Sequence, residues 1–388
     1  MAENRERRFP TAAPDGLVAA LLLAFLATAG LFYVNIMPAL VSGLIDGLHF
    51  SAREAGFAAS ANVYGAAFGA LASVFFVKRI AWRPVAIGLL CAMIAMDLVS
   101  TAITSPHAMI AARFAQGTAG GMEVGTAFSV IARTRVPERA FGMLLVVQFG
   151  IGGVGLMVLP RLVQVLGTPV LFLALVLFSV VTLALLPFLS AYDSGPVEKT
   201  GAGSIRWLPL GFALVAVLLF QAGNMALASY MFELGRFYGL KLDFMSAMLG
   251  IAGWIGAAGS IGVILLGTRW GRALPLAVAF VLTVAGNALF HFSASPTVYA
   301  GANIGTAVTW SFVIPYLLGM CAAFDTSGQT AALGGFCSKL GLASGPLVAG
   351  LLLNGAGYAT LINVAVAALA LSAVFAMVPA SALDRARA

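Results

Sequence analysis

Residues 191–206 read AYDSGPVEKTGAGSIR, the longest polar stretch between apolar segments of this 388-residue chain. Glycine, serine and charged residues dominate it, a composition typical of a flexible connection. Long apolar segments separated by short polar turns lie on both sides of it. The stretch therefore predicts a linker between an N-terminal half at 1–190 and a C-terminal half at 207–388.

The apolar segments have the length that a membrane-spanning helix needs, which is about 20 residues for ~30 Å of hydrocarbon. There are about twelve of them, six on each side of the linker. They are 16–46, 54–77, 84–104, 107–132, 140–165 and 168–190, followed by 207–235, 244–267, 273–292, 297–322, 329–354 and 357–379. This pattern predicts an all-α membrane protein of about twelve transmembrane helices in two six-helix halves.

The composition supports lipid as the solvent of this chain. Charged residues make up 9% and hydrophobic residues 61%, whereas about 25% charged residues are usual in soluble domains. The net charge of +7 comes from short dispersed clusters, which excludes a nucleic-acid-binding surface. No arrangement of nucleophile and base suggests an enzyme, and no cysteine or histidine spacing suggests a metal site or cofactor.

Basic residues predict the orientation, because cytoplasmic loops retain lysine and arginine. With the N-terminus inside, fifteen of the 21 lysines and arginines are cytoplasmic and four lie on the opposite side. Both termini are therefore expected in the cytoplasm. The lack of long soluble loops suits a bacterial inner membrane, and we expect a monomer.

A motif in the fourth segment resembles a known family. Arg113 to Gly121 reads RFAQGTAGG and matches the R-x-x-Q-G-x-x-G signature of the major facilitator superfamily. Basic turns after the second and eighth segments resemble its G-x-x-x-D-R-x-G-R-R loop, with Lys78 and Thr268 at the aspartate position. The resemblance implies a secondary transporter working by alternating access, and it implies a gating role for Arg79, Arg83, Arg269 and Arg272.

Two other functions remain open. A drug or hydrophobic-compound efflux pump usually carries G-x-x-x-G-P in the fifth helix, and here the glycines of 150–155 lack the proline. A non-transporting membrane receptor with a transporter fold is the second alternative. The literal G-x-G-x-x-G at 150–155 lies inside an apolar segment, so it predicts helix packing and no dinucleotide site.

Ionisable residues inside a membrane are costly, and each is a functional candidate. Asp97 and Arg113 could form a structural pair or take part in proton transfer. Glu123 could load and release a proton, or hydrogen-bond to a neighbouring helix. Lys339 could attract an anionic group on a substrate, or pair with Glu123 or Asp325 as a latch. We expect proton coupling through Glu123, Asp97 and Arg113.

Uncharged polar residues complete the candidate site for a small organic solute. The first, fourth, seventh and tenth helices line the central cavity in the superfamily that this chain resembles. For each residue a helix-to-helix hydrogen bond is an equal alternative to substrate contact. The candidates besides Lys339 are Tyr33, Asn35, Gln148, Gln221, Asn224, Trp310 and Ser311.

Overall fold

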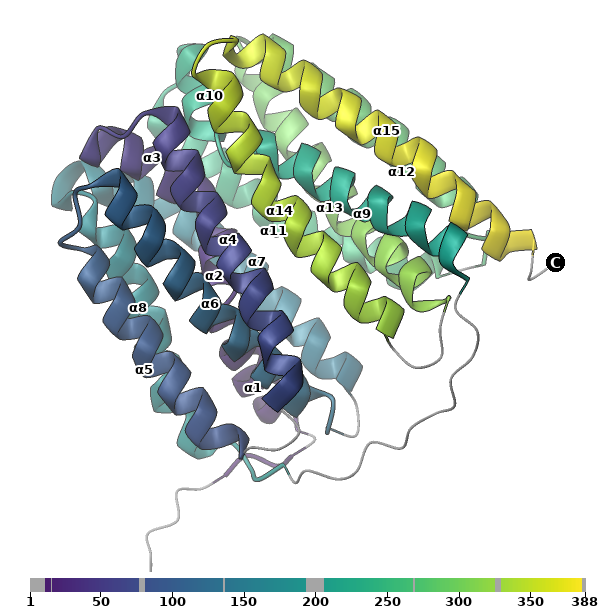
Figure 1. The fold of residues 1–388 in the computed structure, drawn as a ribbon. Coiled ribbons are helices and arrows are strands. Elements are labelled where there is room, and N and C mark those ends of the chain that lie inside the picture. The colour runs from purple at the N-terminus through teal and green to yellow at the C-terminus, as the bar shows by residue number, and fades with distance from the viewer. Residues whose placement is uncertain are drawn as a thin grey trace, which may run out of the picture.

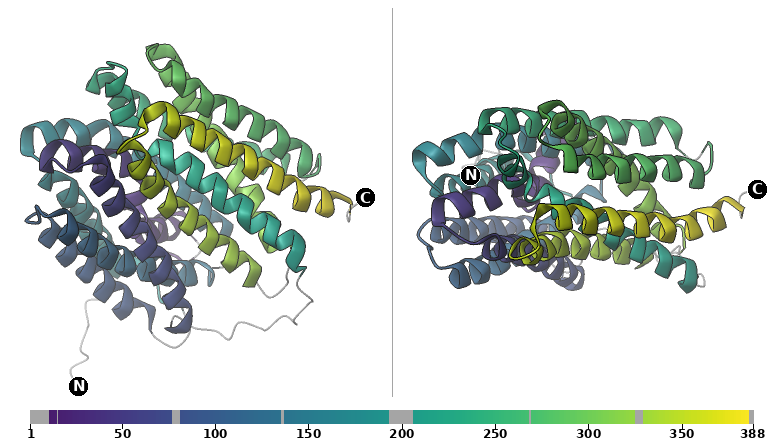
Figure 2. Two further views of the ribbon diagram at one scale, coloured as in Figure 1. Left: turned by 45° about the horizontal axis from the view of Figure 1, so that its top comes forward. Right: turned by 90° about the horizontal axis from the view of Figure 1, so that it is seen from above.

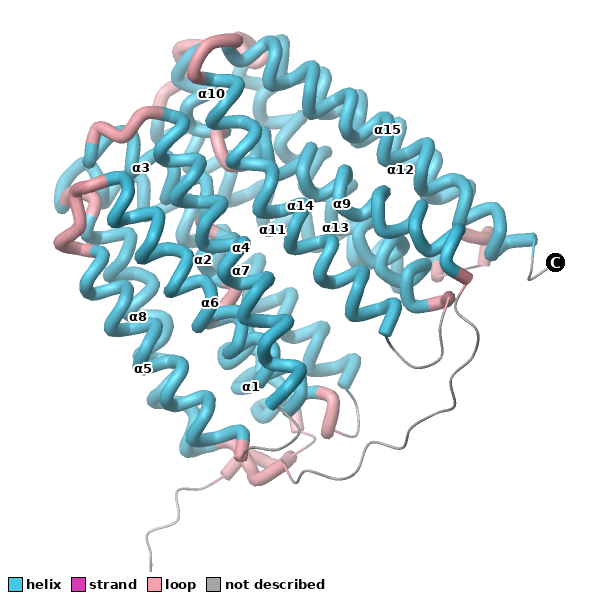
Figure 3. Tube along the Cα trace, viewed as in Figure 1, coloured by secondary structure: helices cyan, strands magenta, loops and turns pink. Residues whose placement is uncertain are grey.

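The structure, a computed structural model, describes residues 11–14, 16–76, 81–134, 137–192, 206–267, 269–324 and 329–385. Within these ranges its elements are helices, with one isolated bridge and no named strand (Figure 3). The all-α fold is confirmed. The helices are α1 (Leu17–Ala29), α2 (Phe32–Asn35), α3 (Met37–Leu48), α4 (Ala52–Phe76), α5 (Trp82–Ser100), α6 (Pro106–Ile131), α7 (Pro137–Leu166), α8 (Pro169–Leu185), η1 (Leu186–Phe188), α9 (Trp207–Ala228), α10 (Met231–Phe237), α11 (Leu242–Leu266), α12 (Ala273–Ala288), η2 (Leu289–Phe292), α13 (Pro296–Ala322), α14 (Gln329–Leu353) and α15 (Gly357–Arg385).

The first predicted segment is not one unbroken helix. Residues 16–46 divide into α1, α2 and the start of α3, with breaks at Gly30–Leu31 and at Ile36. Pro38 stands in the first turn of α3, where its missing N–H is tolerated, whereas inside a continuous helix it would remove a hydrogen bond. Hydrophobicity alone could not reveal these breaks, because broken and unbroken segments are equally apolar.

Nine helices of the described residues are long and apolar enough to cross a membrane. The remaining predicted segments are the broken first one, α4 and α6, so the number of twelve crossings stays a prediction. α4 and α6 pack closely through small residues. A Cβ on Gly65 would lie 2.2 Å from the Phe114 carbonyl oxygen, and one on Gly117 would lie 1.9 Å from that of Asn62. Only glycine at these positions allows α4 and α6 to lie this close together.

The helices lie in two groups (Figures 1 and 2). The N-terminal group, α1–α8 with η1, and the C-terminal group, α9–α15 with η2, meet mainly through α4 against α14 and α7 against α11. We call the end where η1 ends and α9 begins the linker side, and the opposite end the far side. Most of the predicted linker, 193–205, lies outside the described residues.

Candidate functional site

A buried ion pair joins α5 to α6. Arg113 Nη1 lies 2.7 Å from Asp97 Oδ1, and both side chains have zero exposure. Arg113 also donates to Ser100 Oγ, and its guanidinium lies 4.9 Å from the centroid of the Phe172 ring. Tyr33 contributes a second ring at 6.0 Å. The pair expected from the sequence is therefore present, and it is enclosed in the N-terminal group.

Two amides that the sequence analysis did not select extend this pair. Gln116 Nε2 donates to Asp97 Oδ2 at 3.3 Å, and Asn62 Nδ2 donates to the carbonyl oxygen of Arg113 at 3.3 Å and to Gln116 Oε1. Gln116 lies three residues after Arg113 and thus on the same helix face. That spacing was the signal that could have identified it, whereas Asn62 on α4 offered none.

Glu123 reaches the break in the first predicted segment. The backbone N–H of Gly30 donates to Glu123 Oε2 at 3.1 Å, while Oε1 is buried and has no hydrogen-bond partner. A Cβ on Gly30 would lie 2.2 Å from the carbonyl oxygen of Gly120, so only glycine allows α1 this close to α6. The carboxyl group is held in a site that needs both the helix break and the glycine.

The remaining candidates of the N-terminal group, Asn35 and Gln148, are joined by one long hydrogen bond. Asn35 Nδ2 lies 3.5 Å from the carbonyl oxygen of Gln148, at the limit of a hydrogen bond. Gln148 is partly buried in the middle of α7. These two residues place α2 against α7, and among the described residues no hydrogen bond connects them to Glu123.

Three helices of the C-terminal group meet at a polar cluster formed by Gln221, Trp310 and Ser338. Gln221 Nε2 donates to Ser338 Oγ at 2.7 Å, and Trp310 Nε1 donates to Gln221 Oε1 at 2.7 Å. The two bonds fix the Gln221 amide between α13 and α14. Ser338, which precedes Lys339 in the chain, was not selected from the sequence. Two expected residues are thus bonded directly to each other, and one that was missed holds the other end of the Gln221 amide.

Two other expected residues point away from that cluster. Asn224 Nδ2 donates to the Phe220 carbonyl oxygen at 3.0 Å, and its Oδ1 lies 3.5 Å from Asn287 Nδ2 on α12. Ser311 donates to the carbonyl oxygens of Gly256 and Val308. Both side chains have ordinary helix-to-helix or intrahelical bonds, the alternative that the sequence left open.

Lys339 lies on the face of α14 that meets α4. Ala343, Pro346 and Gly350 follow it by four, seven and eleven residues, the spacing of one helix face. Pro346 and Gly350 are in close contact with Gly56 and Ala52 of α4. Lys339 itself is partly buried, and no acidic side chain or hydrogen-bond acceptor among the described residues partners it.

Hydrogen bonds and ion pairs between the two groups gather on the far side and at mid-height. On the far side Arg236 of α10 pairs with Asp46 of α3, and Arg161 of α7 pairs with Asp243 of α11 at 2.8 Å. Tyr230 donates to the carbonyl oxygen of Ala52.

At mid-height Tyr64 bonds Ser344 at 2.9 Å, and Trp254 Nε1 donates to the Gly150 carbonyl oxygen at 3.0 Å. Between the described side chains of 65–73 on α4 and 333–343 on α14 no such bond is found. Figure 1 shows the two groups diverging toward the linker side. Within the described residues, the bonds between the groups thus lie on the far side and at mid-height.

A family model described as the Major Facilitator Superfamily matches residues 20–346. The chain belongs to the Major Facilitator Superfamily. The match confirms the resemblance carried by the motif at Arg113–Gly121, and with the apolar helices it makes the protein an integral multi-pass membrane transporter.

Solved structures of superfamily members share the fold. The nucleoside transporter NupG matches with a TM-score of 0.68 and 15% identity, covering 94% of this chain and 98% of that one. The human organic anion transporter MFSD10 (TETRAN) matches with a TM-score of 0.66 and 17% identity, covering 94% and 100%. At these identities the likeness concerns the fold. A comparison with curated proteins finds no match.

The basic turns that resemble the superfamily's loop motif make contacts within their own groups. Arg83 donates to the carbonyl oxygen of Leu189. The backbone N–H of Arg272 donates to both carboxylate oxygens of Asp384 on α15 at 2.8 Å, so Asp384 caps the start of α12. Arg269 is exposed, and Arg79 lies outside the described residues. Their gating role stays a prediction.

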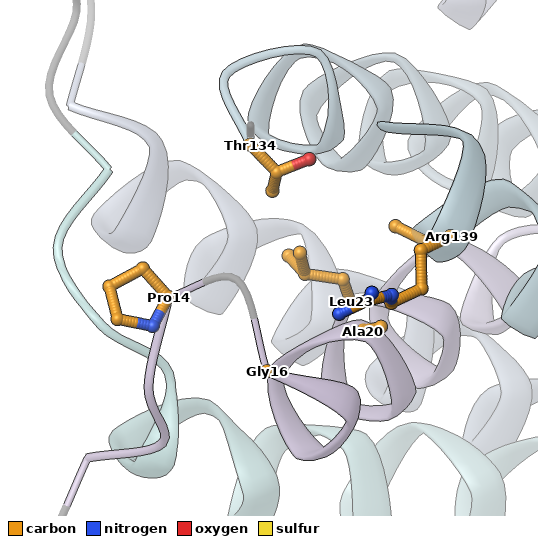
Figure 4. Close-up of a pocket in the computed structure, with 7 residues that line it drawn as sticks. Pro14, Gly16, Ala20, Leu23, Thr134 and Arg139 are labelled. Carbon is orange, nitrogen blue, oxygen red and sulfur yellow. The ribbon is translucent and has the colours of Figure 1, made fainter. Parts of the chain in front are cut away.

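One small hollow lies apart from all these residues (Figure 4). Its cavity volume is about 10 Å³, and it is lined on the linker side by Pro14, Gly16, Ala20, Leu23, Thr134, Arg139 and Ala140. Ligand pockets usually enclose about 300–1,000 Å³. None of the expected solute-binding residues lines it, so it is not the candidate site.

Proposed function

We propose that this superfamily member is a secondary transporter that moves a small organic solute by alternating access. Residues 1–190 and 207–388 act as two halves that rock about their mid-height contacts, with 191–206 as the connection. The observation that carries the proposal is the uneven distribution of bonds between the groups, which are found at mid-height and on the far side. Such an arrangement is expected of a carrier open toward the linker side.

Proton coupling through Glu123, Asp97 and Arg113 is the proposed driving mechanism. Glu123 supports it because one carboxyl oxygen has no partner and because the other depends on a backbone N–H at a helix break. Any movement of α1 against α6 would change that bond. The Asp97–Arg113 pair lies near the other end of α6 and would respond to the same movement.

The proposed setting is a bacterial inner membrane with both termini and the linker side in the cytoplasm. The distribution of lysine and arginine supports this orientation. The far side, with its ion pairs Arg236–Asp46 and Arg161–Asp243, would then face the exterior. The protein is expected to act as a monomer.

The test is proton movement in sealed proteoliposomes that contain a pH-sensitive dye, with organic anions and then lipophilic cations as solutes. Wild type is compared with Glu123→Gln and with Glu54→Gln, a control in which a partly exposed carboxylate at the start of α4 is neutralised. A solute-dependent signal that is lost only in Glu123→Gln supports the proposal. Solute transport with equal proton movement in all three contradicts proton coupling through Glu123.

A preference for lipophilic cations would identify an efflux pump. The absence of any solute movement, together with ligand-induced stabilisation of the purified protein, would contradict transport and indicate a receptor.

A further inference from the structure

Lys339 occupies a position at which a positive charge needs a partner. It lies near the middle of α14, between Gln329 and Leu353, where an unpaired cation would sit at membrane depth. The exposed leucines Leu333 and Leu351 lie about 120° away around the helix at 100° per residue. Lys339 therefore points away from the lipid-facing side of α14 and toward the space between the groups.

No acidic residue of the described helices forms an ion pair with Lys339. α9 and α13 carry no charged residue, and α4 carries none after Glu54 in its first turn. The acids at membrane depth in the N-terminal group are engaged elsewhere, Asp97 by Arg113 and Glu123 by the Gly30 N–H. The expected latch between Lys339 and Glu123 is not formed, and Asp325, the other expected latch partner, lies outside the described residues.

Open space lies one turn from Lys339 on α14, and its neighbour in the chain belongs to an oriented polar cluster. Gly335 lies one turn before Lys339 toward the linker side, and a Cβ built there would meet no atom within 4 Å outside the backbone of its own helix, as far as the described residues reach. Ser338, beside Lys339 in the chain, is held by Gln221, which in turn is held by Trp310. Lys339 and the open position at Gly335 thus share one side of α14, and the serine beside Lys339 in the chain carries the bonds to the amide and the indole.

We propose that Lys339, together with Ser338, Gln221 and Trp310, forms the subsite for the anionic group of the transported solute, so that the substrate class is organic anions. The inference rests on the proposed transport function. The anion supplies the counter-charge that the helices lack, because charge-assisted N–H···O bonds are about twice as strong as neutral ones. The Gln221 amide and the Trp310 indole then contact the uncharged part of the solute.

The test measures charge selection directly and needs no identified substrate. In a chain with Cys91, Cys321 and Cys337 replaced by serine or alanine, Gly335→Cys is labelled in nanodiscs with anionic sulfonatoethyl or cationic trimethylammonioethyl methanethiosulfonate. Each rate is divided by that of a free thiol. With Lys339 present the anionic reagent should react faster, and Lys339→Gln should lower the anionic-to-cationic ratio by about tenfold.

Controls separate a local effect from overall charge. Lys339→Arg should keep the ratio, and so should Lys241→Gln, which removes an exposed lysine from the far side. If Gly335→Cys does not fold, Leu342→Cys on the same side of α14 replaces it. A ratio that does not change in Lys339→Gln overturns the proposal. So does a thiol that reacts with neither reagent, because Lys339 would then not adjoin an aqueous site.

Transport assays distinguish the two proposals. Charge-selective labelling in a protein that moves no solute retains the anion subsite and contradicts the proposed function. Uptake of an organic anion that is unchanged in Lys339→Gln retains the transporter and overturns the subsite.

Discussion

Arg236 on α10 joins the C-terminal group to Asp46 on α3, with Nη1 at 2.6 Å from Oδ1. The same guanidinium donates to Ser42 Oγ at 2.9 Å and lies 3.8 Å from Glu233 of its own helix. Both oxygens of Glu233 are buried without a hydrogen bond. The far side is therefore closed by a charged cluster whose members come from both groups.

Removing this pair should favour opening of the far side. Arg236→Gln is expected to raise the thiol-labelling rate of Ser60→Cys, a buried position on α4, by up to about fivefold, because partly exposed ion pairs contribute at most about 1 kcal/mol. Arg53→Gln, which removes an exposed far-side cation that makes no ion pair among the described residues, is the control. An equal rise in both variants would assign the effect to net charge.

The Arg113–Asp97 pair should be strongly coupled. Either Asp97→Asn or Arg113→Gln is expected to lower the free energy of unfolding by about 3–5 kcal/mol, because each leaves a buried charge without its partner. The double variant should recover part of that loss. Denaturation of the four proteins in detergent gives the coupling energy from a double-mutant cycle, and strict additivity of the two losses would disprove the coupling.

Gly30→Ala should destabilise the N-terminal group by about 1–3 kcal/mol, because the new methyl group would overlap the Gly120 carbonyl oxygen and push α1 from Glu123. Gly88→Ala on α5 is the matched control, since its Cβ would meet no atom within 4 Å. It should leave stability unchanged or raise it by about 0.5–1 kcal/mol. Thermal unfolding checks both, and equal effects would show that the close approach is unimportant.

Loss of the Asp384 cap should loosen the start of α12. Asp384→Ala is expected to cost about 0.5–2 kcal/mol, the usual range for losing a helix cap, since Arg272 and Ala273 would lose their acceptor. Asp384→Asn retains one acceptor oxygen and should cost less. Hydrogen exchange of the amides at 272–273 reports the change, and unaltered protection in Asp384→Ala would contradict the cap.

Much of the candidate site could not be read from the chain. The pair of Arg113 and Asp97 could be predicted from the sequence because adjacent predicted helices placed the two residues at the same depth. Gln221 and Trp310 could be selected as polar residues at mid-segment, but nothing in their spacing indicated that Ser338 bonds to Gln221. Glu233 went unnoticed because it stands near a segment end, where a carboxylate is expected to reach water.

The sequence by itself determined the solvent of this protein, its helical class and its superfamily, because apolar length and the motif at 113–121 are local properties. Only the tertiary structure decided which polar groups meet. Glu123 and Gly30 are 93 residues apart and Arg236 and Asp46 are 190 apart, and helical periodicity assigns a face without naming its neighbour. Hydrophobicity measures transfer from water to lipid, which is the same for every pairing of helices, whereas partners are selected by close packing at glycines and by the need to satisfy buried charge.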